Sequence, residues 1–332
     1  MRSRAGLSKS DATCTRIRYR REYDGSRSMT DELRQRLKTV HAYAVTPFRP
    51  DDLMTIDREA FLGNLRYLVE AGVQVIAVGG GTGEIDALRA DELEWLARRA
   101  LDEVGGKALV IPTLPGNTGV AVELASSYQR FGAEVCLAMP PYQRNGVPDD
   151  LTGVTDHLRL ISAAAPALQL LPYNTQGWSV EFFEQLATVE AVIGVKDPCF
   201  DDHPLFRAIQ RLGDRFVWIG NKRHDPGVLH LRYQAGIDGF TAGFINFLPE
   251  PELELERLSH DRDWEAMVAI QRRLAPLERL RNRFGDALIK AGLDAVGLVG
   301  GAVRPPRVDV SDKGRAALGA ELEKGWGIQI HT

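Results

Sequence analysis

The sequence predicts an α/β protein whose main domain is a (β/α)8 TIM barrel with a C-terminal helical extension. From about residue 40 onward, short apolar runs alternate with longer amphipathic runs, and this alternation repeats eight times without a change in composition. Eight such repeats favour a closed barrel over an open doubly wound sheet. An open sheet that binds dinucleotides also needs a glycine-rich turn at the start of its first helix. The first strand here ends in Thr46-Pro47-Phe48 instead.

The eight predicted strands are short, apolar runs rich in β-branched residues. They are Val40–Thr46, Val73–Val78, Ala108–Thr113, Glu134–Met139, Ala167–Leu171, Val192–Val195, Phe216–Ile219 and Ile237–Thr241. A helical pattern follows each strand, at Asp57–Glu70, Asp91–Val104, Val120–Phe131, Leu151–Ala164, Val180–Ala187, His203–Leu212, Pro226–Gln234 and Pro249–Ser259. Gly72, Gly132 and Gly236 each end a helical run, where a left-handed residue turns the chain back toward the next strand.

The two ends of the chain differ from this repeating part. After about residue 262 the pattern is purely helical, at Asp263–Arg283, Asp286–Val296 and Lys313–Lys324. We expect residues 262–332 to pack as helices beside the barrel of residues 29–261, within the same domain. Residues 1–28 are rich in arginine and have no apolar periodicity, but Asp11 and Glu22 carry the wrong charge for a transit peptide. We interpret them as a disordered extension, with Met29 as a candidate true start.

Composition and charge argue against a nucleic-acid-binding, a membrane-spanning or a disulfide-rich protein. The 332 residues are 44% hydrophobic and carry a formal net charge of −4, which argues against a nucleic-acid or anionic-membrane partner because both require a basic face. No apolar run approaches the roughly 20 residues of a transmembrane helix. Cys14, Cys136 and Cys199 are odd in number and far apart, so they do not form a disulfide framework. These features predict a cytoplasmic protein.

Lys196 is the first candidate for chemistry. Active sites of such barrels lie at the carboxyl ends of the strands. Lys196 directly follows the apolar run Val192–Val195, so its stem begins inside the barrel, where burial lowers the pKa of an amine and frees it to attack a ketone. The alternative is a lysine paired with Asp197 or another nearby carboxylate. Lys222 ends the next strand and is a rival amine, but Arg223 and His224 beside it predict a more solvated position.

A glycine-rich turn, Gly79–Glu84, follows the second predicted strand. Glycines allow several main-chain N–H groups to converge on an anion, and the hydroxyl of Thr82 adds a donor. The turn could therefore hold a substrate carboxylate, or it could be a tight turn without a ligand. It lacks the Gly-Lys-Ser/Thr ending of a phosphate-binding loop.

Two tyrosines, Tyr142 and Tyr173, end neighbouring predicted strands. An isolated tyrosine on a barrel rim usually packs on a loop. Two of them beside a candidate amine favour a proton relay.

Other kinds of catalytic centre lack support in the sequence. None of the seven histidines forms an i, i+4 pair, and none lies near a cysteine at the spacing of metal ligands. We therefore predict no metal site. A Gly-x-Ser-x-Gly elbow, which would indicate a Ser-His-Asp hydrolase, is also absent.

In this order, the motifs resemble the dihydrodipicolinate synthase / N-acetylneuraminate lyase superfamily over roughly residues 38 to 325. The matching segments are Ala44–Phe48, Thr82-Gly83-Glu84, Pro140-Pro141-Tyr142, Tyr173-Asn174, Gly194–Asp197 and Arg304-Pro305-Pro306. The resemblance implies a (β/α)8 barrel with C-terminal helices, usually a tetramer of paired dimers. It also implies a small-molecule 2-keto acid as substrate, and no cofactor, because the lysine itself supplies the electron sink.

The resemblance assigns roles to individual residues. Lys196 falls on the Schiff-base lysine, and Tyr173 on the tyrosine that passes protons to and from the substrate. Thr82 and Gly83 fall on the carboxylate-binding turn. Tyr142 matches the tyrosine that, in the synthase, reaches toward the site of a neighbouring subunit.

Two departures from the synthase bear on the substrate. Gly81 stands where the synthase has a threonine whose hydroxyl links its two tyrosines. Trp178 stands where the synthase has an arginine for the carboxylate of its second substrate. Both departures argue against condensation with aspartate semialdehyde.

A likeness closer than that to the synthase is to 5-dehydro-4-deoxyglucarate dehydratase. The shared segments are Gly80–Glu84, Asn246–Pro249, Leu280–Arg283, Ile289–Gly292 and Val303–Pro306. We therefore expect a Schiff-base lyase that dehydrates and decarboxylates a keto-deoxy sugar acid, with Gly81, Thr82, Gly83 and Asn246 binding the substrate. The sequence also has Asp86 where that branch has an uncharged residue, which would place a carboxylate near the pocket. The alternatives are dihydrodipicolinate synthase or another pyruvate-dependent aldolase, and a non-catalytic barrel that binds a small molecule.

Overall fold

The computed structural model describes residues 29–141, 150–222, 225 and 227–331. Eight parallel strands form the predicted barrel, and their order around it is β5-β4-β3-β2-β1-β8-β7-β6. The strands are β1 (Val40–Tyr43), β2 (Val75–Val78), β3 (Leu109–Leu114), β4 (Val135–Ala138), β5 (Gln169–Pro172), β6 (Gly194–Lys196), β7 (Val217–Asn221) and β8 (Gly239–Ala242). Two isolated parallel bridges, Leu170 with Val192 and Tyr173 with Lys196, close the seam between β5 and β6.

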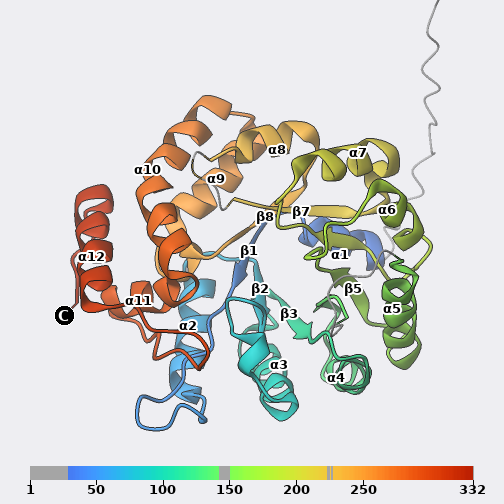
Figure 1. The fold of residues 1–332 in the computed structure, drawn as a ribbon, viewed down its shortest axis with the longest axis horizontal. Coiled ribbons are helices and arrows are strands. Elements are labelled where there is room, and N and C mark those ends of the chain that lie inside the picture. The colour runs from blue at the N-terminus through green and yellow to red at the C-terminus, as the bar shows by residue number, and fades with distance from the viewer. Residues whose placement is uncertain (1–28, 142–149, 223–224, 226, 332) are drawn as a thin grey trace, which may run out of the picture.

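Helices surround the strands (Figure 1). Those in and before the barrel are α1 (Met29–Arg36), α2 (Arg58–Glu70), α3 (Ala90–Val104), α4 (Thr118–Arg130), α5 (Thr152–Ala164), α6 (Val180–Leu186), α7 (Asp202–Leu212), α8 (Leu229–Ala235) and α9 (Pro249–Asp261). Short 3₁₀ turns lie at η1 (Ile85–Ala87), η2 (Gly213–Arg215) and η3 (Phe244–Asn246). The predicted alternation of strand and helix is confirmed, with ends that differ by a few residues.

Local capping explains where several helices begin and end. The side chains of Asp57, Asn117 and Ser179 each accept a hydrogen bond from a backbone N–H in the first turn of α2, α4 and α6, respectively. Gly72 and Gly132 have φ of +95° and +86°, as expected for glycines that turn a helix back into a strand.

The inside of the barrel is a separate apolar cluster that α1 helps to close. Its strand residues include Val75, Ala77, Leu109, Ile111, Val135, Leu137, Val217 and Ile219. Leu33 and Leu37 join this cluster from the segment before β1, and burying each leucine is worth about 2 kcal/mol. Arg34 donates to the carbonyls of Ile193 and Arg215, just before β6 and β7. Helix α1, which the sequence did not reveal, therefore covers the amino ends of the strands.

Three more helices follow the barrel and gather on one side of it, at α10 (Trp264–Phe284), α11 (Ala287–Ala295) and α12 (Asp312–Trp326) (Figure 1). Helix α10 contacts α8, α9, α11 and α12, and α11 contacts η3. The predicted C-terminal helices are thus present and packed on the barrel. None of the helices described has the length and apolar content needed to cross a bilayer.

Candidate active site

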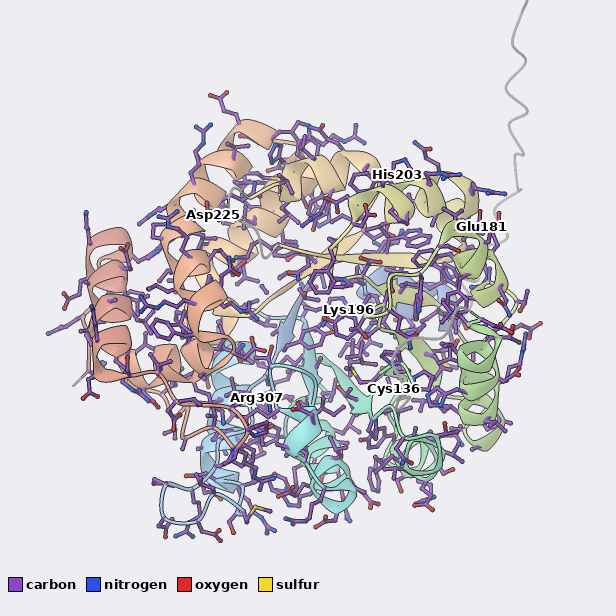
Figure 2. The ribbon with its side chains drawn as sticks, viewed as in Figure 1. Cys136, Glu181, Lys196, His203, Asp225 and Arg307 are labelled. Carbon is purple, nitrogen blue, oxygen red and sulfur yellow. The ribbon has the colours of Figure 1, made fainter. Side chains whose placement is uncertain are left out.

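Lys196 ends β6 and lies near the middle of the molecule (Figure 2). Its side chain is 6% exposed. The amine Nζ lies 3.6 Å from the ring centroid of Tyr43 and 4.0 Å from that of Tyr173. The strand therefore places the amine between the faces of two phenol rings, at the carboxyl end of the barrel.

Burial lowers the pKa of Lys196 to about 7, while the charges of Asp286 and Arg281 shift it upward and downward, respectively. A substantial fraction of the amine is therefore uncharged near neutral pH and available as a nucleophile. Among the described residues, no carboxylate forms an ion pair with Nζ. Asp197 instead accepts hydrogen bonds of 2.7 Å from Nδ2 of Asn174 and from the backbone N–H of Cys199. The alternative pairing of Lys196 with Asp197 is therefore wrong.

A cavity of about 90 Å³ opens over Lys196. Four of the predicted site residues line it, namely Gly81, Thr82, Tyr173 and Lys196. Tyr43, Asn221, Thr241, Arg281 and Asp286 line it as well. Within the described ranges, no three His, Cys, Asp or Glu side chains come together as a set of metal ligands.

In the glycine turn after β2, some residues line the cavity and another packs closely against the first strand. Gly81 and Thr82 face the cavity, whereas Gly83 packs on β1, where an added Cβ would lie 3.1 Å from the carbonyl oxygen of Ala44. The hydroxyl of Thr46 donates to the Gly83 carbonyl at 2.8 Å. Gly83 thus fixes the turn to the first strand, and Gly81 and Thr82 are the members that face the cavity.

Buried charges also hold this turn. Glu84 adopts a left-handed φ of 63° and is 1% exposed. Its carboxylate lies 2.5 Å from Nζ of Lys290 and accepts a 2.9 Å hydrogen bond from the backbone N–H of Arg304. The C-terminal part of the chain therefore fixes the end of the turn.

Asn246 does not line the cavity. Its amide Nδ2 donates to the carbonyls of Tyr43 at 3.0 Å and Gly243 at 2.8 Å. The side chain is 2% exposed and ties the end of β1 to the turn after β8. Tyr142, the remaining predicted catalytic residue, lies outside the described residues.

The expectation that Lys222 is more solvated is wrong. Its side chain is 4% exposed, and Nζ lies 2.6 Å from Glu278 and 3.0 Å from Glu252. Burial alone would lower the pKa of Lys222, but the two carboxylates raise it above its ordinary value. Lys222 therefore stays charged as part of a buried ion cluster and is a poor nucleophile.

Asp86 and Trp178 are also placed away from the cavity. The carboxylate of Asp86 is 58% exposed and pairs with Arg307 at 2.5 Å, and Asp86 is not among the residues that line the cavity. Arg307, its partner, is labelled in Figure 2. Trp178 is 1% exposed and packs on the rings of Phe182 and Phe183. Its indole N–H donates to Gln176. Residue 178 is therefore a buried indole where the synthase has an arginine.

The C-terminal helices supply two cavity residues that the sequence did not reveal. Arg281 near the end of α10 lies 2.8 Å from Asp286, which precedes α11. The guanidinium lies against Gly243, where an added Cβ would be 2.4 Å from Nη1. Two signals in the sequence point to them: Arg281 lies in the shared segment Leu280–Arg283, and the two charges flank the break between two helical runs at Gly285.

Comparison with known proteins gives consistent matches. The model of the dihydrodipicolinate synthetase family matches residues 36–325. A protein of Methylobacterium radiotolerans named "Probable 5-dehydro-4-deoxyglucarate dehydratase" is 30% identical over 286 residues, covering 84% of this chain and 92% of its own. A protein of the same name from Saccharopolyspora erythraea is 30% identical over 304 residues, covering 88% of this chain and 95% of its own.

Solved structures of dihydrodipicolinate synthases are similar in fold. The enzyme from Bacillus clausii superposes with a TM-score of 0.80 at 25% identity, covering 88% of this chain and 99% of its own. The enzyme from Thermotoga maritima superposes with a TM-score of 0.77 at 26% identity, covering 86% of this chain and 97% of its own.

Proposed function

Because the chain belongs to the dihydrodipicolinate synthetase family, we propose that it is a lyase that forms a Schiff base between Lys196 and a 2-keto acid. The substrate we propose is a keto-deoxy sugar acid such as 5-dehydro-4-deoxyglucarate, which the enzyme dehydrates and decarboxylates. The observation that carries the proposal is the buried Lys196 amine, whose pKa is lowered to about 7 and which faces a cavity between two phenol rings. The choice of this substrate is supported by the names of two relatives, each "Probable 5-dehydro-4-deoxyglucarate dehydratase".

The first step is addition of the Lys196 amine to the 2-oxo carbon. The nitrogen lone pair forms the C–N bond, and the carbonyl π electrons move to the oxygen. Tyr173 lies next to the amine, and in this proposal it carries the proton from nitrogen to that oxygen, so that water leaves and an iminium remains. Thr82 and the backbone of Gly81 are the groups we propose for the C1 carboxylate.

The iminium then serves as the electron sink for the later steps. With the carbons numbered from the carboxylate beside the keto group, the iminium acidifies C3. A proton leaves C3, the electron pair left there expels hydroxide from C4, and the proton and hydroxide together make one water. The resulting conjugated iminium accepts the electrons released when the C6 carboxylate leaves as carbon dioxide. Proton return and hydrolysis of the imine give a five-carbon keto acid with an aldehyde end. The overall change is loss of one water and one carbon dioxide, with no external oxidant or reductant.

Two alternatives have less support. A synthase that condenses pyruvate with aspartate semialdehyde needs a cation for the second carboxylate, and Trp178 at that position lies in the core. A barrel that only binds a small molecule gains nothing from a lysine whose pKa is lowered to about 7 at the cavity floor.

Reductive trapping tests the proposal. Cyanoborohydride is added with pyruvate or with 2-oxoadipate, a six-carbon keto diacid that has no hydroxyl to lose. We expect a stable adduct that peptide mapping places on Lys196, and no adduct in Lys196→Ala. Lys313→Ala is the matched control because Lys313 is exposed on α12 and should not affect trapping. An adduct on Lys222, or none with either acid, contradicts the mechanism.

A further inference from the structure

Tyr43 brings a second phenol to the cavity, from a strand to which no catalytic role has been assigned above. It ends β1, where it pairs in register with Ala77 of β2, and its side chain is 3% exposed. Its ring face contacts Nζ of Lys196 at 3.6 Å. The ring fits because residue 80 is glycine, where an added Cβ would lie 3.1 Å from Cδ1 of Tyr43.

The hydroxyl of Tyr43 is buried and has no hydrogen-bond partner among the described residues. A buried hydroxyl without a partner is costly, so its retention calls for a reason. Tyr128 provides a contrast, because its buried hydroxyl donates to the carbonyl of Thr113 at 3.0 Å. Burial, with Tyr173 adding to the effect, raises the pKa of Tyr43 well above its usual range. The phenol therefore stays protonated and is a hydrogen-bond donor at any working pH.

At residue 81, the glycine turn after β2 offers no side-chain hydroxyl that could donate a hydrogen bond in place of Tyr43. Gly81 has no side chain, and nothing lies within 4 Å of where its Cβ would be. The amine of Lys196 lies over the face of the Tyr43 ring, 3.6 Å from its centroid, so a group bonded to Nζ would lie close to this phenol. The oxygen on C2 of a keto acid joined to Nζ would be only two bonds from that nitrogen.

We infer that Tyr43 is a catalytic residue whose hydroxyl donates a hydrogen bond to the C2 oxygen of the 2-keto acid as Lys196 adds to it. Negative charge develops on that oxygen when the C–N bond forms, and the donor stabilises it without giving up its proton. Proton transfer remains with Tyr173. The inference rests on the proposed function, since it requires that Lys196 form an imine.

The test compares Tyr43→Phe with Tyr128→Phe, each of which removes one buried hydroxyl and keeps the ring. The measured quantity is the rate of cyanoborohydride trapping on Lys196 with pyruvate and with 2-oxoadipate. We expect Tyr43→Phe to slow trapping about a hundredfold, the usual cost of removing one such donor. We expect Tyr128→Phe to trap at the wild-type rate, because its hydroxyl lies in the core.

Thermal unfolding provides a second readout that separates catalysis from structure. Tyr43→Phe removes a hydroxyl that has no partner, so its unfolding temperature should equal or exceed that of the wild type. Tyr128→Phe loses a hydrogen bond and leaves the Thr113 carbonyl without it, so it should unfold at a lower temperature. Trapping by Tyr43→Phe at the wild-type rate, or equal slowing of both variants, would overturn the inference. Absence of any adduct in the wild-type protein would overturn the proposed function, and this inference with it.

Discussion

Tyr173 and Lys196 pair with each other across the seam where β5 and β6 close the barrel. The backbone N–H of Asn174 donates to the Lys196 carbonyl at 2.9 Å, and the Lys196 amine lies 4.0 Å from the Tyr173 ring centroid. The proposed nucleophile and proton carrier are therefore held in register by the main chain itself. Their spacing therefore depends on the closure of the barrel between β5 and β6.

The first prediction concerns pH. Only the uncharged amine attacks a ketone, and the pKa of Lys196 is lowered to about 7. The rate of trapping with pyruvate should therefore rise with pH through about 7 and level off above it. An exposed lysine would give a rate that still rises near pH 10, and that outcome would contradict the buried-amine mechanism.

Two variants should move this pH dependence in opposite directions. Asp286 stabilises the ammonium form of Lys196, and Arg281 destabilises it. Asp286→Asn should shift the rise in rate to lower pH, and Arg281→Gln should shift it to higher pH. Pyruvate is the appropriate probe because it lacks a distal carboxylate that either residue could contact. Shifts in the same direction would show that neither charge acts on the amine as described.

The second prediction concerns the substrate. With purified protein, 5-dehydro-4-deoxyglucarate should release carbon dioxide, whereas pyruvate with aspartate semialdehyde should not condense at a significant rate. Trp178 lies in the core and cannot pair with the carboxylate of aspartate semialdehyde, and Gly81 lacks the hydroxyl that links the two tyrosines of the synthase. Loss of one charge-assisted hydrogen bond costs about 1.5–3 kcal/mol, which is roughly one to two powers of ten in rate. Efficient condensation would show that these two positions do not decide the reaction.

The third prediction contrasts the two buried lysines in stability. Lys222→Met leaves Glu252 and Glu278 without their cation, so we expect a loss of about 3–5 kcal/mol in the free energy of unfolding. Lys196→Met should instead be at least as stable as the wild type at pH 7. Denaturant unfolding of both variants at the same pH provides the comparison.

The pH dependence of the Lys196→Met effect has a definite sign. The pKa of Lys196 is near 7 in the folded protein and near 10.5 when the chain is unfolded, so the unfolded chain binds more protons between these values. The stability of the wild type relative to Lys196→Met should therefore rise as pH increases from about 7 to about 10. A flat difference over this range would mean that the folded-state pKa is not lowered.

Much of the barrel could be predicted because buried parallel strands appear as short apolar runs. Lys196 was evident for the same reason, as a charge directly after such a run. Helix α1 was missed because only Leu33 and Leu37 of its region enter the barrel interior, too few to give a periodic pattern.

The residues that were missed or misplaced depend on contacts between distant parts of the chain. The neighbours of Lys222 in sequence are Arg223 and His224, but its partners in space are Glu252 and Glu278. Tyr43 and Arg281 reach the cavity from the first strand and from α10, respectively. Only the packing of these elements around the barrel brings them to Lys196.

The ion pair between Glu84 and Lys290 connects the glycine turn of the barrel to helix α11 of the C-terminal extension. Lys290 lies on α11, next to the segment that contributes Arg281 and Asp286 to the cavity. Exchange of the C-terminal helices between two relatives would therefore transfer the cavity charges together with the restraint on the glycine turn. A chimera whose junction lies just after β8 would therefore separate Arg281 and Asp286 from the barrel residues of the same cavity. We expect such exchanges to preserve the site only when the barrel and the C-terminal helices come from the same protein.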